Sequence, residues 1–251
     1  ILFFLLLRLI IIVMSYMFSP KKSPYIIKGL HEGNKLVIKP QNPTIKKSMT
    51  LYRSKNENDG IEFSYSVWLN IDYRMKHTTY NHIFSKGSFT NTDKMGIYYP
   101  NNCPGLYFNS THTSAIREDD DSENILNELV FVMNTYNNPQ ETVVVSNIPL
   151  EKWINVVIRV TDNIVDVYIN GIITKRHILS GVPKQNYEDI IVCGGSLNGF
   201  DGQLSNLRYY DYSLNALEIN AITLKGPNLK AAKTKGTSTP PYLSTNWYLN
   251  N

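Results

Sequence analysis

The residues with the clearest potential for chemistry are three closely spaced carboxylates, Glu118, Asp120 and Glu123. Two carboxylates about 5–5.5 Å apart can cleave a glycosidic bond with retention, one as nucleophile and the other as acid and base. A catalytic strand also needs apolar residues on its alternate face to seat it in a sheet. Here the interleaved residues are all polar: Asp119, Asp121 and Ser122. The run is therefore typical of a solvated acidic loop, and we predict that the protein is not an enzyme.

The same run offers hard oxygen ligands for calcium at Asp119, Asp120 and Asp121. The EF-hand pattern is absent because no glycine occupies the required position. A calcium site is the alternative to a flexible acidic loop, and we predict neither a metal nor a cofactor. The five histidines are scattered without the spacing of a metal site. Cys103 and Cys193 are too few for a disulfide framework, and we expect two free thiols, with pairing as the alternative.

Tyrosine is abundant, with 17 residues in the chain. Two adjacent pairs fall on predicted strands, where one ring of each pair must face outward because side chains alternate. Exposed tyrosines suit protein interfaces and sugar stacking alike, and ordinary sheet-face aromatics are the alternative. An apolar cluster near the end of the chain could also dock on a neighbour. The candidate interface residues are Tyr98, Tyr99, Tyr209, Tyr210, Trp247 and Tyr248.

Strands must position these residues. In residues 61–71 every odd position is apolar, and the even positions are mostly small or polar, with Trp68 the exception. This period of two predicts a half-buried strand. About ten further short segments of strand character follow, separated by turn residues, which indicates an all-β sandwich or barrel. Asn170-Gly171 predicts a tight hairpin, since it supplies the positive φ angles of a type I′ turn. A single short helix is predicted near Leu214 to Ile222, with Asn215 and Glu218 as a capping box.

Residues 1–18 are uncharged except for Arg8 and nearly all apolar, and they approach the length of about 20 residues that spans a bilayer core. Arg8 costs about 2.5–3.5 kcal/mol at a helix centre, which the surrounding Leu, Ile and Phe side chains can outweigh. We predict an uncleaved transmembrane anchor, with a cleaved signal peptide as the alternative. Lys21 and Lys22 follow at once, so the folded domain is predicted to lie on the cytoplasmic side.

The net charge of +4 conceals a basic collar after this segment. Residues 21–55 hold nine Lys or Arg side chains against one acid, Glu32. Such a collar suits anionic lipid headgroups, with Lys21, Lys22 and Lys28 as the predicted contacts, and a solvated linker is the alternative. No basic face interleaved with aromatic residues is evident, so we predict no nucleic-acid partner.

Five segments occur in an order that resembles the laminin-G-like family of concanavalin-A-like jelly rolls. The resemblance covers residues 58–224 and implies a two-sheet antiparallel jelly-roll sandwich. With the N-terminal transmembrane helix, this is the predicted fold. The segments are Phe63-Ser-Tyr-Ser-Val-Trp-Leu, His82-Ile-Phe-Ser-Lys-Gly87, Ile148-Pro-Leu-Glu-Lys-Trp-Ile-Asn-Val-Val-Ile158, Val165-Asp-Val-Tyr-Ile-Asn-Gly171 and Gly199-Phe-Asp-Gly-Gln-Leu-Ser-Asn-Leu-Arg-Tyr-Tyr210.

The anchor, the basic segment and two further motifs are similar to proteins of this family encoded by large nucleocytoplasmic DNA viruses. The motifs are Pro104-Gly-Leu-Tyr-Phe108 and His177-Ile-Leu-Ser-Gly-Val-Pro-Lys-Gln-Asn-Tyr187. This resemblance implies a minor capsid or membrane-associated virion protein, with a lipid membrane and other capsid proteins as partners. The alternative is a membrane-anchored carbohydrate-binding module with glycans as partners. The expected division is an anchor over 1–18, a basic extended stalk over 19–57, the sandwich over 58–224 and a flexible tail over 225–251.

Overall fold

The computed structural model describes residues 2–18, 23–45, 48–57, 60–72, 79–113, 124–194 and 199–232. Two helices and fifteen strands occur in these residues. They are α1 (Leu2–Phe18), β1 (Leu30–Glu32), β2 (Val37–Lys39), β3 (Lys55–Glu57), β4 (Gly60–Ile71), β5 (Asn81–Gly87), β6 (Asn91–Thr92), β7 (Tyr98–Tyr99), β8 (Asn102–Thr113), β9 (Asn124–Met133), β10 (Glu141–Ser146), β11 (Ile154–Thr161), β12 (Ile164–Ile169), β13 (Ile172–Ile178), β14 (Ile190–Val192), β15 (Gly202–Tyr210) and α2 (Ala216–Lys225).

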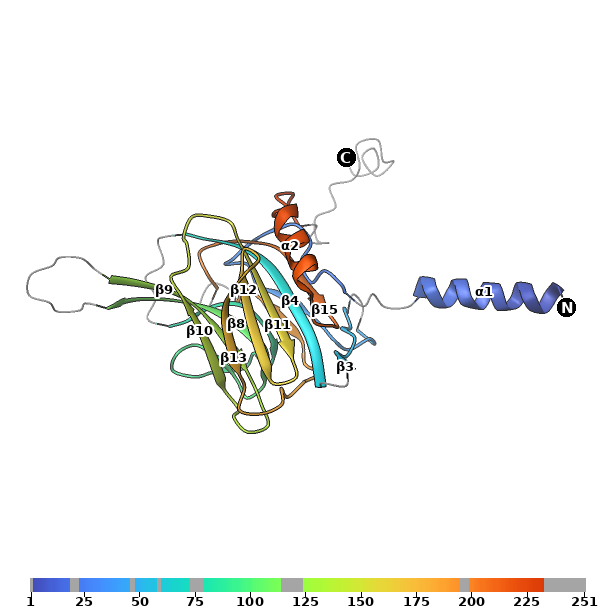
Figure 1. The fold of residues 1–251 in the computed structure, drawn as a ribbon, viewed down its shortest axis with the longest axis horizontal. Helices are drawn as coiled ribbons and strands as arrows, with labels where there is room; N and C mark the ends of the chain where they lie inside the picture. The colour runs from blue at the N-terminus through green and yellow to red at the C-terminus, as the bar shows by residue number, and fades with distance from the viewer. Residues whose placement is uncertain are drawn as a thin grey trace, which may run out of the picture.

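Two antiparallel sheets form the body of the molecule (Figure 1). The first has the strand order β1-β15-β4-β11-β12-β13, with β3 added beside β4. The second has the order β10-β9-β8-β5-β14-β2. A small pair, β6 and β7, lies apart from both. The prediction of a two-sheet antiparallel sandwich is therefore confirmed.

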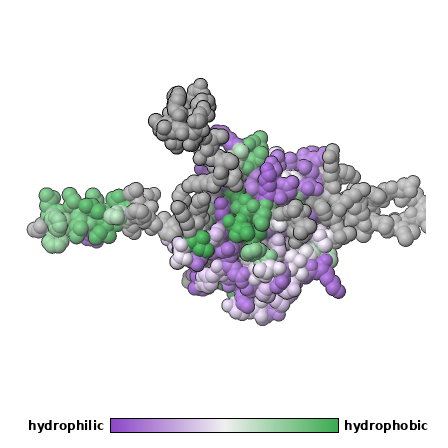
Figure 2. Space-filling model, turned by 180° about the vertical axis from the view of Figure 1, so that it is seen from behind, coloured by the Kyte–Doolittle hydropathy of each residue, from purple (hydrophilic) through white to green (hydrophobic). Residues whose placement is uncertain are grey.

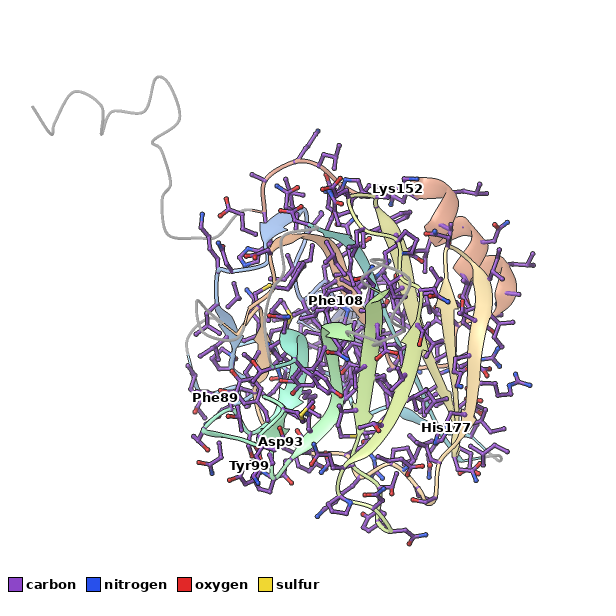
Figure 3. The ribbon with its side chains drawn as sticks, turned by 90° about the vertical axis from the view of Figure 1, so that its left-hand side faces the viewer. Phe89, Asp93, Tyr99, Phe108, Lys152 and His177 are labelled. Atoms are coloured by element: carbon purple, nitrogen blue, oxygen red, sulfur yellow. The ribbon has the colours of Figure 1, made fainter. Side chains whose placement is uncertain are left out.

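The core lies between the inward faces of the two sheets. β4 shows how the sequence encodes it, because Phe63, Tyr65, Val67, Leu69 and Ile71 all enter one apolar cluster. The period of two predicted this face correctly. The opposite face of β4 is also buried, since α2 packs over the outer side of this sheet. From the other sheet Phe108 lies in the interior of the sandwich, as Figure 3 shows, whereas Tyr99 lies at the periphery.

Two local predictions are confirmed at atomic level. Asn170 and Gly171 have φ angles of 51° and 83° and join β12 to β13 in a tight hairpin. Asn215 caps α2, because its side chain accepts a hydrogen bond from the backbone N–H of Glu218. Glu218 completes the box by accepting the N–H of Asn215. Each feature depends on residues three or fewer positions apart, which is why the sequence alone reveals it.

Residues 23–57 differ from the extended stalk that we predicted. β1, β2 and β3 lie in this stretch, and they add to the two sheets. Ile26 and Ile27 are buried in the core between the sheets. Residues 35–39 have the composition of a strand, and β2 forms there, whereas β1 and β3 are only three residues long and carry too little periodicity to be recognised from the sequence. The sandwich therefore begins before residue 58.

The predicted transmembrane helix also requires correction. α1 is helical, and its face in Figure 2 is apolar, with the side chains of residues 2–14 exposed. Within the described parts of the chain, however, no helix combines the length and the apolar character needed to cross a membrane. The 17 residues of α1 span only about 26 Å, against about 30 Å for a hydrocarbon core.

Candidate functional site

An open pocket of about 430 Å³ lies between the two sheets at one end of the sandwich. β4 and β15 of one sheet and β5 and β8 of the other contribute its walls. Two segments far apart in sequence, residues 41–54 and 185–189, complete it. The lining residues are Gln41, Asn42, Pro43, Thr50, Leu51, Tyr52, Arg53, Ser54, Phe63, Tyr65, Lys86, Cys103, Pro104, Gln185, Asn186, Tyr187, Asp189 and Tyr209.

Three aromatic side chains form an apolar wall of the pocket. Phe63 and Tyr65 occupy inward positions of β4, and Tyr209 occupies an inward position of β15. The Tyr65 ring centroid lies 5.1 Å from that of Tyr209 and 6.1 Å from that of Phe63. The Tyr209 hydroxyl donates to the backbone oxygen of Tyr52, 3.0 Å away, which fixes the ring. Each of these rings is at most 4% exposed and packs in the core, so the aromatic rings of the lining that a ligand can contact most fully are those of Tyr52 and Tyr187.

Lys86 places a cation on the inward face of the second sheet. It lies opposite Ile190 in the register of β5 and β14, and Ile190 belongs to the core. Because directly opposed residues share a face, the lysine side chain points between the sheets. Its ammonium donates to the backbone oxygen and to the side-chain oxygen of Asn186, the latter at 3.1 Å. Burial lowers the pKa of Lys86 to about 8.

The two segments that complete the pocket are bonded to each other. Asp189 accepts the backbone N–H of Gln41 at 2.9 Å. The amide of Gln41 in turn donates to the oxygen of Met49 at 2.7 Å and accepts from the N–H of Leu51 at 3.0 Å. Gln185 donates to the hydroxyl of Ser54. These bonds hold both segments in place, so the pocket exists before a ligand binds.

The lining holds few groups that are typical of a catalytic site. Asp189 is the one carboxylate among the described residues that line the pocket, so no carboxylate pair is available there for glycosidic cleavage. The thiol of Cys103 is buried, and burial raises its pKa to about 12, which keeps it protonated and unreactive. What remains is an aromatic wall, a half-buried cation and a rim of amide and hydroxyl groups, which is typical of a ligand-binding pocket.

A smaller cavity of about 190 Å³ lies beneath α2, beside Trp68 and Arg208. The guanidinium of Arg208 lies 4.6 Å from the ring centroid of Tyr25 and 4.8 Å from that of Tyr210. It also donates to the backbone oxygen of Ser23 at 3.1 Å. We interpret this arginine as a structural link between the segment before β1 and the outer face of the sheet.

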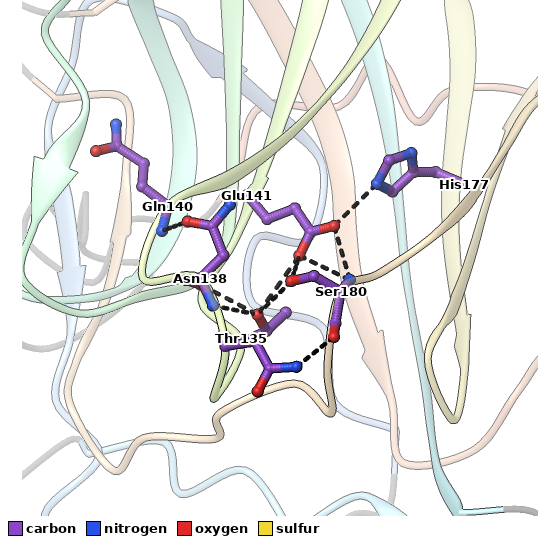
Figure 4. A network of polar contacts seen from close by, with 7 residues as sticks. Thr135, Asn138, Gln140, Glu141, His177 and Ser180 are labelled. Atoms are coloured by element: carbon purple, nitrogen blue, oxygen red, sulfur yellow. Dashed lines mark hydrogen bonds and ion pairs between the residues drawn. The ribbon is translucent and has the colours of Figure 1, made fainter.

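A polar network at the far edge of the sandwich resembles a catalytic triad only in its residue types (Figure 4). Glu141 accepts hydrogen bonds from the Ser180 hydroxyl at 2.7 Å and from the Ser180 N–H at 2.9 Å, and lies 3.0 Å from His177. In a triad the histidine must contact the serine hydroxyl. No hydrogen bond between His177 and Ser180 occurs in the described structure, and the serine hydroxyl is used by Glu141. We call this network the clamp, because it ties Glu141 of β10 to Ser180, which follows β13.

The structure separates the residues that the sequence suggested for an interface. Tyr98, Tyr209 and Tyr210 are buried, and Tyr99 is 44% exposed. Tyr210 lies on the opposite face of the sheet from Tyr209, as alternation predicts, but α2 and neighbouring residues cover the Tyr210 ring. Lys28 is exposed, with its ammonium 6.0 Å from the ring centroid of Tyr25. The remaining predicted site residues lie outside the described residues: Lys21, Lys22, Glu118, Asp119, Asp120, Asp121, Glu123, Trp247 and Tyr248.

Lys86 was not anticipated, although its sequence context contains a signal. It follows Phe84 by two positions in a strand whose inward face is otherwise apolar. A charge at an inward position contradicts the pattern of a half-buried strand, and such contradictions occur at functional sites. In the part of the chain that the structure describes, no three or more potential metal ligands lie together, so the described residues offer no candidate metal site.

The comparisons with known proteins agree with this architecture. A structure of an HCR/D mutant matches with a TM-score of 0.52 at 11% identity, over 81% of this chain and 51% of that one. The receptor-binding domain of botulinum neurotoxin mosaic serotype C/D matches with a TM-score of 0.47 at 12% identity, over 65% of this chain and 36% of that one. A heptameric SAP-like pentraxin from Limulus polyphemus matches with a TM-score of 0.42 at 15% identity, over 64% and 69%.

At 11% identity the match to the HCR/D mutant shows the fold alone. The chain spans about a third to a half of the length of the first two structures. No curated protein matched the sequence. A family model described as the concanavalin A-like lectin/glucanases superfamily, of laminin-G type, matches residues 47–220. This match covers more than half of the chain and includes β4 and β15, which line the pocket, so the protein belongs to the concanavalin A-like lectin/glucanase superfamily.

Proposed function

We propose that the protein is a carbohydrate-binding module and that the pocket between the sheets is its binding site. One observation carries the proposal: a preformed pocket of about 430 Å³ combines an aromatic wall with a polar rim. Small-molecule sites occupy about 300–1,000 Å³, so this pocket is large enough for a ligand of that class. Membership of a superfamily of lectins and glucanases supports a saccharide as the ligand.

The proposal is binding without catalysis. Saccharide ligands need aromatic faces for their apolar ring surfaces and amide or hydroxyl groups for their hydroxyls. Tyr52 and Tyr187, which are both exposed, supply the first, and Asn42, Gln185 and Asn186 supply the second. Asp189 alone cannot act as both nucleophile and acid in retaining glycosidic cleavage.

Isothermal titration of the full chain with soluble oligosaccharides tests the proposal. Tyr187 lines the pocket and is 87% exposed, so Tyr187→Ala should weaken binding without disturbing the fold. Tyr136 is 74% exposed and does not line the pocket, and Tyr136→Ala is the matched control. Saturable binding that Tyr187→Ala weakens by about tenfold or more, while Tyr136→Ala leaves it unchanged, would support this site. Absence of binding to any saccharide would overturn the proposal.

A second candidate is a structural protein that joins a membrane to a capsid shell, with the folded domain on the capsid-facing side of a virion membrane. The exposed apolar side chains of α1 favour it, since residues 2–14 are exposed and apolar apart from Arg8. Lys28 adds an exposed cation beyond the helix. Flotation of the full chain with anionic liposomes tests the membrane part. A charged variant, Leu5→Glu with Ile12→Glu, should not float with the liposomes if α1 makes the contact. Equal flotation of the wild type and this variant would exclude membrane contact through α1.

A further inference from the structure

Lys86 is a half-buried cation that forms no ion pair with another described residue. The ion pairs formed by the described residues do not include it. Burial lowers the pKa of Lys86, and the negative charges of Glu188 and Asp189 oppose this lowering, but the described hydrogen bonds of both carboxylates go to other groups. Asp189 accepts the N–H of Gln41, and Glu188 accepts the hydroxyl of Ser88 at 2.8 Å and the side-chain amide of Asn101. A half-buried ammonium that lines a pocket and forms no ion pair with a described residue can still pair with an anion from outside the chain.

The ammonium group has one hydrogen left for such an anion. Lysine carries three donors, and Asn186 accepts two of them, through its backbone and side-chain oxygens. Both acceptors belong to one residue of the pocket wall. The third donor can therefore reach a ligand in the pocket, whose walls also include Cys103 and Tyr65.

The charges around the pocket favour a ligand with one negative charge. Lys86 and Arg53 are cationic, and Asp189 is the one acid among the described lining residues. The neighbouring hydroxyl and thiol groups of Tyr65, Tyr209 and Cys103 are neutral near pH 7, because burial raises the pKa of each. One half-buried lysine matches a carboxylate, whereas a phosphate monoester brings about −1.5 to −2 charges and needs more donors.

We infer that the pocket recognises a saccharide that bears a carboxylate group, with the carboxylate against Lys86 and the sugar ring against the exposed rings of Tyr52 and Tyr187. This inference rests on the proposed function and narrows its ligand class to acidic sugars. The carboxylate supplies the ion-pair partner that Lys86 lacks among the described residues. The rim amides of Asn42 and Gln185 then face the ring hydroxyls.

The experiment compares matched ligands on the full chain at pH 6.5. Uronic-acid oligosaccharides and their neutral hexose counterparts are titrated into the wild type and into Lys86→Met. Lys152→Met, at an exposed position, is the matched control. The wild type and Lys152→Met should bind the acidic ligand at least about tenfold more tightly than the neutral one, and Lys86→Met should lose that preference. Repeating the wild-type titration from pH 6.5 to pH 9.5 should show the preference fading above about pH 8, where the apo lysine deprotonates.

The outcomes separate the inference from the proposed function. Equal affinity for acidic and neutral sugars would overturn the inference and leave carbohydrate binding intact. Binding of no saccharide would overturn both. Tighter binding of a sulfated sugar than of the uronic acid would overturn the assignment of the anion as a carboxylate. Tighter binding of octanoate than of the uronic acid would overturn the assignment of the ligand as a sugar. If Lys86→Met does not fold, the pH series on the wild type decides, and a preference that persists unchanged at pH 9.5 would count against Lys86.

Discussion

Lys86 and Asn186 hold one another through three hydrogen bonds across the pocket wall. The lysine ammonium donates to both oxygens of Asn186, and the Asn186 side-chain amide donates to the backbone oxygen of Lys86 at 3.0 Å. The pair ties β5 to the segment before β14, 100 residues further along the chain. It positions the one half-buried cation of the described pocket lining and closes that side of the pocket at the same time.

Replacing Asn186 with Ala should therefore weaken both the fold and the site. The change removes the two bonds that the Asn186 side chain makes, keeps the backbone acceptor, and leaves a half-buried ammonium with one acceptor fewer, which costs about 1–3 kcal/mol. Urea unfolding followed by tryptophan fluorescence measures this loss. Asn220→Ala, at an exposed position of α2, should change the free energy of unfolding by less than about 0.5 kcal/mol. Equal stability of the two variants would show that the lysine does not depend on Asn186.

Replacing Lys86 with Met should stabilise the protein while it removes the acidic-ligand preference. The methionine keeps much of the packing and removes a desolvated charge, and the loss of the two hydrogen bonds to Asn186 offsets part of this, so a net gain of up to about 1 kcal/mol at pH 7 is expected. The folded-state pKa of about 8 lies below the unfolded value of 10.5. Between these values the unfolded chain binds more protons, so wild-type stability rises with pH and the advantage of the variant should shrink.

Thermal unfolding of wild type and Lys86→Met from pH 7 to pH 10 measures this difference, with Lys152→Met as the control. If Lys86 serves binding at a cost in stability, the variant should be more stable than wild type at pH 7 and the difference should shrink as the pH rises. A variant that is less stable than wild type across the whole range would instead identify Lys86 as a structural residue.

Replacing Glu141 with Gln should destabilise the clamp between β10 and the residues after β13. Burial opposes ionisation of Glu141, but hydrogen bonds from Ser180 and His177 outweigh burial and lower the pKa of this carboxyl below its usual value. A loss of about 1–3 kcal/mol at pH 7 is expected, because an amide cannot accept all the bonds that the carboxylate accepts.

The pH dependence follows from the direction of this shift. The contribution of Glu141 is fully present above the unfolded pKa of about 4.3 and is lost as the pH falls through the lower folded pKa. The difference between wild type and Glu141→Gln should therefore narrow below about pH 4.3, as guanidinium unfolding curves can show. Glu151→Gln, at an exposed position, should match wild type throughout. A difference that stays constant down to pH 3 would mean that ionised Glu141 contributes nothing.

Replacing Asn215 with Ala should remove the cap of α2. The cap accepts the N–H of Glu218 at 2.9 Å, and its loss costs about 0.5–2 kcal/mol. Asn215→Ser keeps an acceptor at the same position and should retain most of the stability. Differential scanning calorimetry of both variants tests the prediction, and identical melting of Asn215→Ala and wild type would contradict it.

The sequence by itself determined the features that depend on neighbours along the chain. Alternation over residues 61–71 identified the inward face of β4, and Asn170-Gly171 identified the β12–β13 hairpin. Asn215 and Glu218 identified the start of α2. These signals work because backbone geometry repeats every two residues in a strand and because turns and caps are closed within four residues.

Only the tertiary structure decided which residues form the site. The pocket joins residues 41–54, β4, β5, β8, residues 185–189 and β15, and nothing in any one segment reports on the others. The tertiary structure placed Lys86 between the sheets, where it forms no ion pair with another described residue. It also buried Tyr210 beneath α2, although strand alternation alone placed that ring on the outer face. Burial and charge pairing depend on what packs against a residue, and that partner is set by long-range contacts that no local pattern encodes.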